Sequence, residues 1–505
     1  MAARPGPSRS KLVSTYYDSA ERALARHSLT LRVRKAGSRY VQTVKSAGKT
    51  AGKSAGAGGA SMLGRGEWED EVAGEHPDLG AAQTGRFLSP AVGERLQPVF
   101  CTNIVRVAIP LAPAPQTRIE AAVDRGAIRA PLRDRAEPIS EIELELLEGP
   151  PTALYDVALQ LLDVAPIRLE LRSKAERGYL LAANDGRTAD ATHFGGLVLD
   201  PEEDGESVLQ EFGRACLTQL LGSEAAALGG EAEGVHQMRV ALRRLRAILS
   251  AFSMLIPKDR RDPLDDEIKW LTKALGTARN YDVFAKDTIG AAKKAAIDAA
   301  GLDRLGKAAE RRRRAAYANV RRAIRSPRYT ALLLRLMRWF DGRQWRDEDG
   351  SPADKRLSWP VRAIAPLVLD RRRRTAKKRS RGFSDQSPEQ RHKLRIALKK
   401  LRYTTELFAG LYDTGETKTF IHALKRLQDK LGEANDLQTG RKLVSELAPA
   451  RRRAPALAQS GQRMLAWHAR RIAKGEPKLR EYVAQLFDTP RFWRPEPEAA
   501  EPAAE

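Results

Sequence analysis

The chain has 505 residues, more than one hydrophobic core usually organises, so the length predicts two or three domains. Its formal charge of +24 comes from residues 211–505, where 62 Lys and Arg against 36 Asp and Glu give +26, while residues 1–210 carry −2. Such a basic half predicts polyanionic partners. Two cysteines exclude a disulfide framework, and no signal-peptide core or membrane-length apolar run is present, so we expect a cytoplasmic protein without membrane insertion.

Residues 14–149 alternate polar and apolar side chains with a period of two, which predicts short antiparallel strands. Gly and Ser dominate residues 47–64, which we expect to form a flexible loop inside this β unit of residues 1–183. Residues 184–206, rich in Gly, Asp and Glu, are expected to link it to the next unit. The clearest strand segments are TLRVRK (30–35), YVQTVK (40–45), EWEDEV (67–72), NIVRVAI (103–109) and EIELEL (141–146).

Residues 207–490 change to a helical period, in long amphipathic stretches rich in Ala, Leu, Arg and Lys or Glu. Within them HQMRVALRRLR (236–246) matches HKLRIALKKLR (392–402), and LGTARN (275–280) matches LGEAND (431–436). Both pairs are 156 residues apart, so we predict that a whole helical unit is duplicated. Residues 491–505 are of low complexity and are expected to be disordered.

Each copy of the repeated motif places basic residues within roughly 80° on one side of a helix and apolar residues on the other. One such face is usually solvated, but two on corresponding helices favour binding, because pseudo-twofold packing could turn both toward one anion. Only Tyr403 could stack on a base, which favours a phosphate polymer over nucleic acid. The candidate ligands are His236, Arg239, Arg243, Arg244, Arg246, His392, Arg395, Lys399, Lys400 and Arg402.

At these residues the sequence resembles the CHAD family, the conserved histidine α-helical domain, over about residues 207–488. Its members are duplicated helical bundles that bind inorganic polyphosphate in a basic cleft, so the resemblance implies polyphosphate as a partner. Lys269, Lys273 and Lys425, on the helices that lead to the two LG segments, are weaker candidates for the same site.

Charged residues occupy alternating positions in several of the predicted strands. In EIELEL, Glu141, Glu143 and Glu145 share one face, although a solvated strand with the same pattern is the common alternative. Closing the strands into a barrel would gather these charges inside, which is costly unless a metal and an anion join them. Mg²⁺ or Mn²⁺ with a phosphate chain fits that mixture. The other charged positions are Arg32, Arg34, Lys45, Arg65, Glu67, Glu69 and Arg106.

These segments, together with TYYDS (15–19), IEAAVDRG (119–126) and SKAERGY (173–179), resemble the CYTH family of triphosphate tunnel enzymes over residues 12–183. The resemblance implies an eight-stranded antiparallel barrel, inorganic triphosphatase activity and Mg²⁺ or Mn²⁺ as cofactor. It implies metal ligation by Glu141, Glu143 and Glu145, with Glu67 and Glu69 as secondary acidic residues. The phosphate-binding residues that it implies are Arg32, Arg34, Lys45, Arg106, Lys174 and Arg177.

The first strand of that family carries the signature E-x-E-x-K, which nothing before Leu12 supplies, so only seven strand regions are expected. Either the assigned start lies downstream of the true one, which the abrupt beginning favours, or this copy has lost metal ligands. We therefore predict an α+β protein of two domains, an N-terminal antiparallel β-barrel that lacks its first strand and an all-α duplicated helical bundle. The leading hypothesis is a metal-dependent inorganic triphosphatase coupled to polyphosphate binding; the alternatives are a non-catalytic polyphosphate receptor or scaffold and a nucleic-acid-binding protein.

Overall fold

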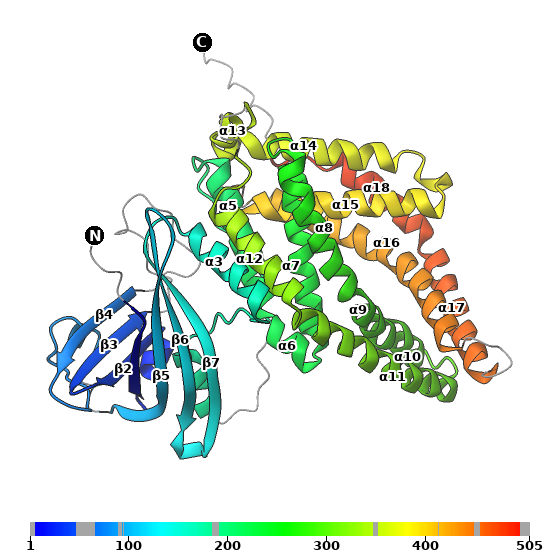
Figure 1. The fold of residues 1–505 in the computed structure, drawn as a ribbon. Helices are drawn as coiled ribbons and strands as arrows, with labels where there is room; N and C mark the ends of the chain where they lie inside the picture. Colours follow the sequence, from blue (N-terminus) through cyan, green and yellow to red (C-terminus); the bar gives the residue numbers. More distant parts are fainter. Residues whose placement is uncertain are drawn as a thin grey trace, which may run out of the picture. The chain divides into compact units, whose positions relative to one another are not determined.

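The computed structural model describes residues 6–46, 66–88, 93, 95–183, 191–346, 352–412, 414–448 and 455–494. The chain separates into two compact units, Met1–Arg187 and Thr188–Glu505 (Figure 1). The loop expected at residues 47–64 lies outside the described residues. No helix among the described residues has both the length and the apolar character that crossing a membrane requires.

The first unit is built on a seven-stranded antiparallel sheet in the order β4-β3-β2-β1-β5-β6-β7. The five segments selected for their alternation lie within β2, β3, β4, β5 and β7, which confirms those strands. The strands are β1 (Ser8–Asp18), β2 (Leu29–Ala36), β3 (Arg39–Ser46), β4 (Gly66–Val72), β5 (Gln97–Ala114), β6 (Thr117–Ala130) and β7 (Arg135–Glu148).

The sequence predicted an antiparallel barrel that lacks its first strand, and the structure has the seven expected strands in an antiparallel sheet that is not closed in the part of the chain that it describes. The physical reason is the strand count. In an all-antiparallel order of seven, the two edge strands β4 and β7 run in the same direction and cannot make an antiparallel ladder with each other. An eighth strand between them would be needed to close the sheet.

Short helices complete the first unit. They are α1 (Ala23–Arg26), α3 (Thr152–Val164) and α4 (Lys174–Ala182). Helix α4 packs on β5, β6 and β7, where its Ala175 and Tyr179 join an apolar cluster with Tyr16, Phe100 and Ile128. A second cluster includes Leu31 and Val33 of β2 and Leu24 of α1. Leu31 and Val33 alternate with Arg32 and Arg34 along β2, so this cluster lies on the face of the sheet opposite to those two arginines.

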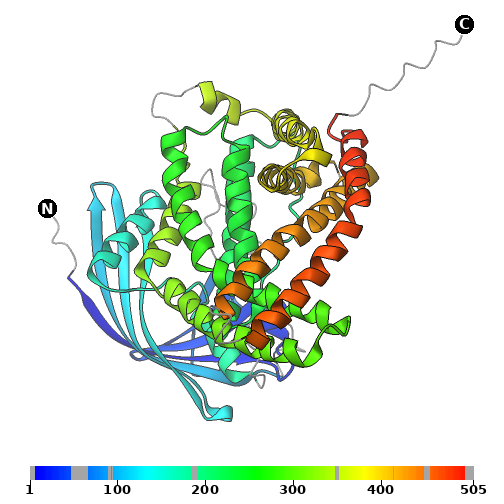
Figure 2. The ribbon, with the colours of Figure 1, turned by 90° about the vertical axis from the view of Figure 1, so that its right-hand side faces the viewer.

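Among the described residues of the second unit the named elements are all helices, as the change of period predicted (Figures 1 and 2). The repeated histidine-led motifs lie on α7 and α15, which pack against each other. The LGTARN segment begins α9, whereas LGEAND lies inside the single long helix α16. The helices are α5 (Gly205–Gly222), α6 (Glu224–Gly229), α7 (Ala232–Ala251), α8 (Lys258–Ala274), α9 (Gly276–Val283), α10 (Gly290–Lys294), α11 (Ala299–Ile324), α12 (Pro327–Asp341), α13 (Pro352–Leu357), α14 (Val361–Ser380), α15 (Pro388–Phe408), α16 (Gly415–Leu447), α17 (Pro455–Lys474) and α18 (Glu476–Asp488), with a π-helical turn at Phe284–Ile289.

Both ends of the helical unit extend beyond the predicted boundaries. In the segment expected to be a linker, Leu199 is buried and the backbone carbonyl of Glu203 accepts a hydrogen bond from the N–H of Val361 at 2.7 Å. In the segment expected to be disordered, Phe492 and Trp493 are buried, and the Trp493 indole donates to Asp370 Oδ1 at 2.9 Å. The disordered-tail prediction is therefore wrong for residues 491–494, because low overall complexity concealed two aromatic anchors; residues 495–505 lie outside the described residues.

Candidate functional site

The register of the sheet gathers the predicted charged residues on one face. Side chains of directly opposite residues in an antiparallel pair project to the same side. Followed from strand to strand, these pairs place the predicted charged residues from β4 at one edge to β7 at the other on the same face of the sheet, as the alternation predicted. The pairs are Glu69 with Thr43, Glu67 with Lys45, Thr43 with Arg32, Arg32 with Tyr16, Arg34 with Ser14, Ser10 with Arg106, Arg106 with Asp124 and Asp124 with Glu141.

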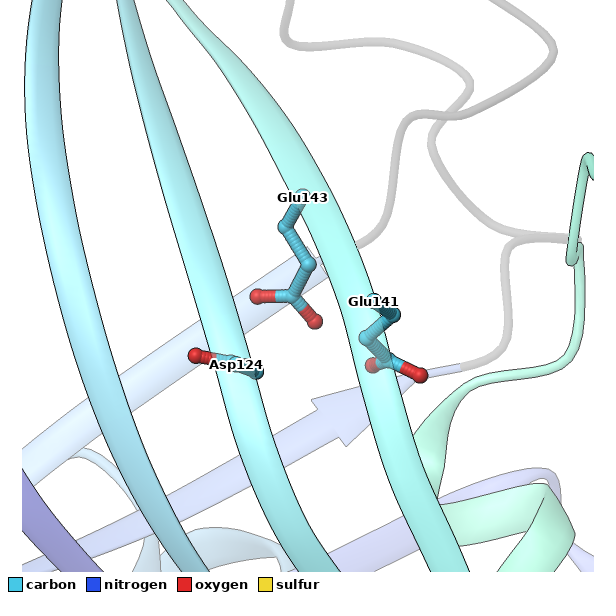
Figure 3. A group of neighbouring side chains, drawn as sticks. All are labelled: Asp124, Glu141 and Glu143. Atoms are coloured by element: carbon cyan, nitrogen blue, oxygen red, sulfur yellow. The ribbon is translucent and has the colours of Figure 1, made fainter. Parts of the chain in front are cut away.

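Three carboxylates converge on this face from the neighbouring strands β6 and β7 (Figure 3). Asp124, Glu141 and Glu143 each offer an oxygen, and the three oxygens lie within 4.8 Å of one another. Asp124 is fully buried. Glu145, which the sequence placed with the glutamates as a metal ligand, is not part of this group and lies opposite Glu120 in the register. Three hard oxygen donors at this spacing could hold Mg²⁺ or Mn²⁺.

Three cations surround the carboxylates. The Lys174 ammonium lies 2.8 Å from Asp124 Oδ2, 2.6 Å from Glu141 Oε1 and 2.5 Å from Glu143 Oε1. Arg106 donates to both oxygens of Asp124, at 2.8 and 2.7 Å, and also to Glu143. From α4, Arg177 donates to Glu141 at 2.5 Å and to Glu137 at 2.8 Å. The structure therefore brings Arg106, Lys174 and Arg177 to the carboxylates, as the resemblance implied for a shared site.

Two carboxylates of this network, Asp124 and Glu143, are held in their charged form. Burial alone would raise the pKa of Asp124, but hydrogen bonds from Arg106 and Lys174 outweigh it and lower that pKa. The pKa of Glu143 is lowered in the same way, by the charges of Lys174 and Arg106 against the effect of burial. Burial would lower the pKa of Lys174, but its carboxylate partners raise it. Asp124, Glu143 and Lys174 are therefore ionised near neutral pH.

Helix α4 is fixed tightly enough to position its two cations. Ser173 and Glu176 form a reciprocal capping box at its start. At Gly178 any Cβ would lie 2.1 Å from the Phe100 ring, so only glycine allows this close approach to β5. The Tyr179 hydroxyl donates at 3.0 Å to the fully buried Asp18, which also accepts from the backbone at the start of α1. Packing and hydrogen bonds thus fix the backbone positions of Lys174 and Arg177.

The predicted residues near the other edge form a second mixed group. Lys45 lies 2.8 Å from Glu67, and Arg32 lies 3.3 Å from Glu67 and 3.5 Å from Glu69. Arg34 donates to Ser14 Oγ at 3.4 Å, and among the described residues no carboxylate forms an ion pair with it. Burial, and then the charge of Arg32, lowers the pKa of Arg34 to about 10. A partly buried guanidinium without a counter-charge favours an added anion.

In the helical unit, cations from both repeats meet in what we call the basic cluster. Arg243 of α7 lies over the ring of Tyr403 of α15 at 5.9 Å, and Arg402 lies over the same ring at 5.0 Å. The charges of Arg243 and Arg395 act on each other and on Lys399, so the two stripes come together as pseudo-twofold packing predicted. The basic cluster consists of Arg239, Arg243, Arg279, Arg395, Lys399 and Arg402.

The cations of the basic cluster lack sufficient counter-charges. The Nε atoms of Arg243 and Arg395 are buried without a hydrogen-bond partner among the described residues. Burial, followed by the charges of Arg395 and Arg243, lowers the pKa of Lys399 to about 7. Burial and then Arg279 lower the pKa of His236 to about 4. These shifts all disfavour positive charge, which an incoming anion would reverse.

The glycine of each LG segment lies beside an arginine of its own repeat. A Cβ at Gly276 would be 3.2 Å from Arg239 Nη1, and a Cβ at Gly432 would be 3.8 Å from Arg395 Nη2. Both pairs are related by the 156-residue offset. The histidine-led motif and the LG segment of each repeat therefore lie side by side, and the glycine leaves room for a guanidinium.

Several predicted ligands have partners outside the basic cluster. Arg244 donates to Gln219 at 2.9 Å and stacks on Phe194, Arg246 pairs with Asp265 at 2.7 Å, and Lys269 pairs with Asp265 and Asp266. Lys400 is close to Arg246 and Arg372 instead. His392 is exposed, unlike half-buried His236, so the two repeats are not equivalent. Lys273 and Lys425 stay predictions.

Comparisons with known proteins assign a family to each of the two units. The CYTH domain family matches residues 6–179 and the CHAD domain family matches residues 211–445. The chain carries a CYTH domain followed by a CHAD domain. An inorganic triphosphatase of Haemophilus influenzae is 31% identical over 173 residues, which are 34% of this chain and 46% of that relative, so the match spans less than half of the relative's length. The crystal structure of a CHAD domain from the plant Ricinus communis is 28% identical, with a TM-score of 0.51 over 60% of this chain and 98% of that one.

Sequence reasoning missed three residues of these sites. Asp124 of the CYTH domain stands in the segment IEAAVDRG, and only the register of β6 with β5 and β7 brings it beside Arg106 and Glu141. In the CHAD domain, Arg279 stands in LGTARN and Asp436 in LGEAND. Burial raises the pKa of Asp436, which lies among Arg395 and Lys399. The equal offset of both motif pairs was the signal that could have joined these LG segments to the histidine-led helices.

Proposed function

We propose that the CYTH domain is a metal-dependent inorganic triphosphatase and that the CHAD domain binds polyphosphate. The observation that carries the first part is the carboxylate group Asp124, Glu141 and Glu143, which shares one sheet face with Arg32, Arg34, Lys45 and Arg106 and is also contacted by Lys174 and Arg177 of α4. A group of cations alone would bind phosphate, and a group of carboxylates alone would bind metal. The presence of both on one face suits a metal–triphosphate complex.

Each group would have a defined task. A divalent ion held by Asp124, Glu141 and Glu143 would supply a Lewis acid and an activated water for attack on the terminal phosphorus. Arg34 would bind phosphate oxygens directly, because it has a donor-rich guanidinium and no carboxylate partner among the described residues. Arg32 and Lys45 would share their positive charge between Glu67 and the phosphate chain, which orients the chain along the sheet.

Polyphosphate binding by the CHAD domain rests on the unmatched cations of the basic cluster. Each charge-assisted hydrogen bond to a phosphate oxygen can contribute roughly 1.5 to 3 kcal/mol, so a few suffice for tight binding. Tyr403 is already covered by Arg243 and Arg402, which leaves no free aromatic platform for a base in this cluster. A polymer of phosphate without bases therefore fits better than RNA.

Phosphate release from inorganic triphosphate, measured with the full chain with and without Mg²⁺, tests the catalytic part. We expect Mg²⁺-dependent release, lowered at least about 100-fold in Glu141→Gln and Glu143→Gln, since each removes a charged ligand from the acidic group. Glu145→Gln is the matched control, because Glu145 lies on the same strand outside that group. No Mg²⁺-dependent turnover, together with intact polyphosphate binding, would instead support the non-catalytic receptor or scaffold.

A further inference from the structure

Lys174 occupies the point at which the three carboxylates converge. Its ammonium lies within 2.8 Å of an oxygen of Asp124, Glu141 and Glu143 alike, and its side chain is only 11% exposed. No other cation on this face contacts all three of these carboxylates among the described residues. An ammonium with three donors thus makes the contacts that a divalent ion would make with the same oxygens.

The charges of these groups limit how a divalent ion can bind among them. Asp124, Glu141, Glu143 and Glu137, which pairs with Arg177, contribute four negative charges, and Arg106, Lys174 and Arg177 contribute three positive charges. A divalent ion that joined all seven would turn this near-balance into an excess of one positive charge at a partly buried site. One cation has to leave, or an anion has to arrive, for such binding to be favourable.

Of the three cations, Lys174 is the one able to leave. Arg106 is held by two hydrogen bonds to buried Asp124, and Arg177 is 8% exposed and also bonded to Glu137. Lys174 is the first residue of α4, whose backbone is fixed by its capping box. Its ammonium is a point charge on a flexible four-carbon stem, so it can swing away while the helix stays in place.

We propose that Lys174 is a tethered cation that competes with divalent metal for these three carboxylates and, when displaced, becomes a ligand of the phosphate chain. The inference rests on the proposed function and adds a coupling to it. In the absence of phosphate, the displaced ammonium loses three partners and gains none, which weakens metal binding. When triphosphate is present, the ammonium exchanges carboxylate oxygens for phosphate oxygens, so metal and triphosphate strengthen each other's binding.

The test is direct measurement of Mn²⁺ binding to the full chain by the electron paramagnetic resonance signal of free Mn²⁺, without triphosphate. Lys174→Met should tighten Mn²⁺ binding by roughly tenfold to a hundredfold, the scale on which one neighbouring charge shifts an ionic equilibrium. Lys174→Arg, which keeps the charge, should bind Mn²⁺ nearly as the wild type does. Lys45→Met is the matched control, because Lys45 pairs with Glu67 and not with these carboxylates.

A second arm measures the coupling with a non-hydrolysable imido analogue of triphosphate. The analogue should tighten Mn²⁺ binding more in the wild type than in Lys174→Met, because only the wild type has a displaced Lys174 ammonium that can bind the phosphate oxygens of the analogue. Should Lys174→Met not fold, as judged by circular dichroism, the wild type still decides. The NMR signal of its isotopically methylated Lys174, assigned with Lys174→Arg, has to move when Mg²⁺ is added.

The outcomes separate this inference from the proposed function. Equal Mn²⁺ affinity in the wild type and Lys174→Met, or a Lys174 signal that stays fixed at saturating Mg²⁺, would overturn the inference while loss of Mn²⁺ binding in Glu143→Gln still supports a metal site. If neither the wild type nor Lys174→Met binds Mn²⁺, and the Lys174 signal does not respond to Mg²⁺, both ideas fail.

Discussion

The carboxylate group of the CYTH domain and the basic cluster of the CHAD domain hold their positive charges in opposite ways. On the sheet face of the CYTH domain, Arg106, Lys174 and Arg177 are each paired with carboxylates at 2.5 to 2.8 Å. In the CHAD domain, the basic cluster has six cations, and Arg243, Arg395 and Arg402 each keep a buried Nε donor without a hydrogen-bond partner among the described residues. The carboxylates that act on the cluster include Asp436, Glu233 and Glu406, and Glu406 forms an ion pair with Arg402 at 3.3 Å.

This difference separates two ways of preparing a site for phosphate. Cations that are paired with carboxylates raise the free energy of the free protein little, but a phosphate ligand has to replace those carboxylates as their partner. Unpaired cations raise the free energy of the folded protein, and a phosphate chain recovers that cost on binding. We therefore expect the CYTH site to select a metal together with its anion and the CHAD site to accept a polyanion directly.

Replacing one arginine in each site should show the largest difference between paired and unpaired cations. Arg106→Met leaves buried Asp124 with only Lys174, and we expect the local stability of the sheet to fall by about 3 kcal/mol. Arg243→Met removes a charge that has no carboxylate ion pair among the described residues, so the helical unit should keep or gain stability. Hydrogen exchange measured on peptides from β5–β7 and from α7 and α15 gives both values, and equal losses would contradict the proposed difference.

Affinity for polyphosphate should respond to the basic cluster nearly as strongly. Arg243→Ala combined with Lys399→Ala removes one cation from each repeat, and we expect at least about a hundredfold weaker binding, since each lost contact costs roughly 1.5 to 3 kcal/mol. Isothermal titration with polyphosphate of fixed length measures this. Arg322→Ala with Arg325→Ala removes the same charge from exposed positions in the last turn of α11 and directly after it, and should change affinity only slightly. A similar loss in both double variants would mean that net charge, and not the cluster, decides binding.

The sequence predicted the parts of these sites that periodicity controls. Alternation in β2, β3, β4 and β7 was enough to place Arg32, Lys45, Glu67 and Glu141 on one face. The equal spacing of the repeats predicted that α7 and α15 would meet. Neither signal contains the strand register, so Asp124 was missed and Glu145 was assigned to the metal group in its place.

The distinction between paired and unpaired cations also lay beyond the sequence. The stripe residues Arg243 and Arg246 belong to one motif and look equivalent in sequence. In the structure, Arg246 pairs with Asp265 of α8, while Arg243 points toward the second repeat without a carboxylate partner among the described residues. Which of two neighbouring arginines finds a carboxylate depends on helix packing over long separations.

The pH dependence of polyphosphate binding should sharpen the comparison further. The pKa of Lys399 is lowered to about 7 by burial and by Arg395, Arg243 and Arg402, so its amine is mostly neutral above that pH in the free protein. A bound polyanion favours the ammonium, so binding takes up a proton there, and affinity should fall by up to about tenfold per pH unit from pH 7 to 9.

Titrations in two buffers of different ionisation enthalpy detect that proton directly. Lys399→Arg keeps its charge over this range and should bind with an affinity that barely changes with pH. Lys399→Met should bind more weakly and also lose the dependence. A wild-type affinity that is constant from pH 7 to 9 would show that Lys399 is not part of the bound surface.

The smallest expected effect compares the two repeats of the CHAD domain with each other. Gly276→Ala would place a Cβ 3.2 Å from Arg239 Nη1, which donates to the carbonyl of Thr272 at 2.7 Å, so the guanidinium has to shift. Gly432→Ala leaves 3.8 Å to Arg395 Nη2, an ordinary contact. We expect polyphosphate binding several-fold weaker for Gly276→Ala and unchanged for Gly432→Ala, whose interior helical position should gain up to about 1 kcal/mol of stability. Titration and thermal denaturation of both variants measure this, and an equal loss of affinity would mean that the two repeats hold their arginines alike.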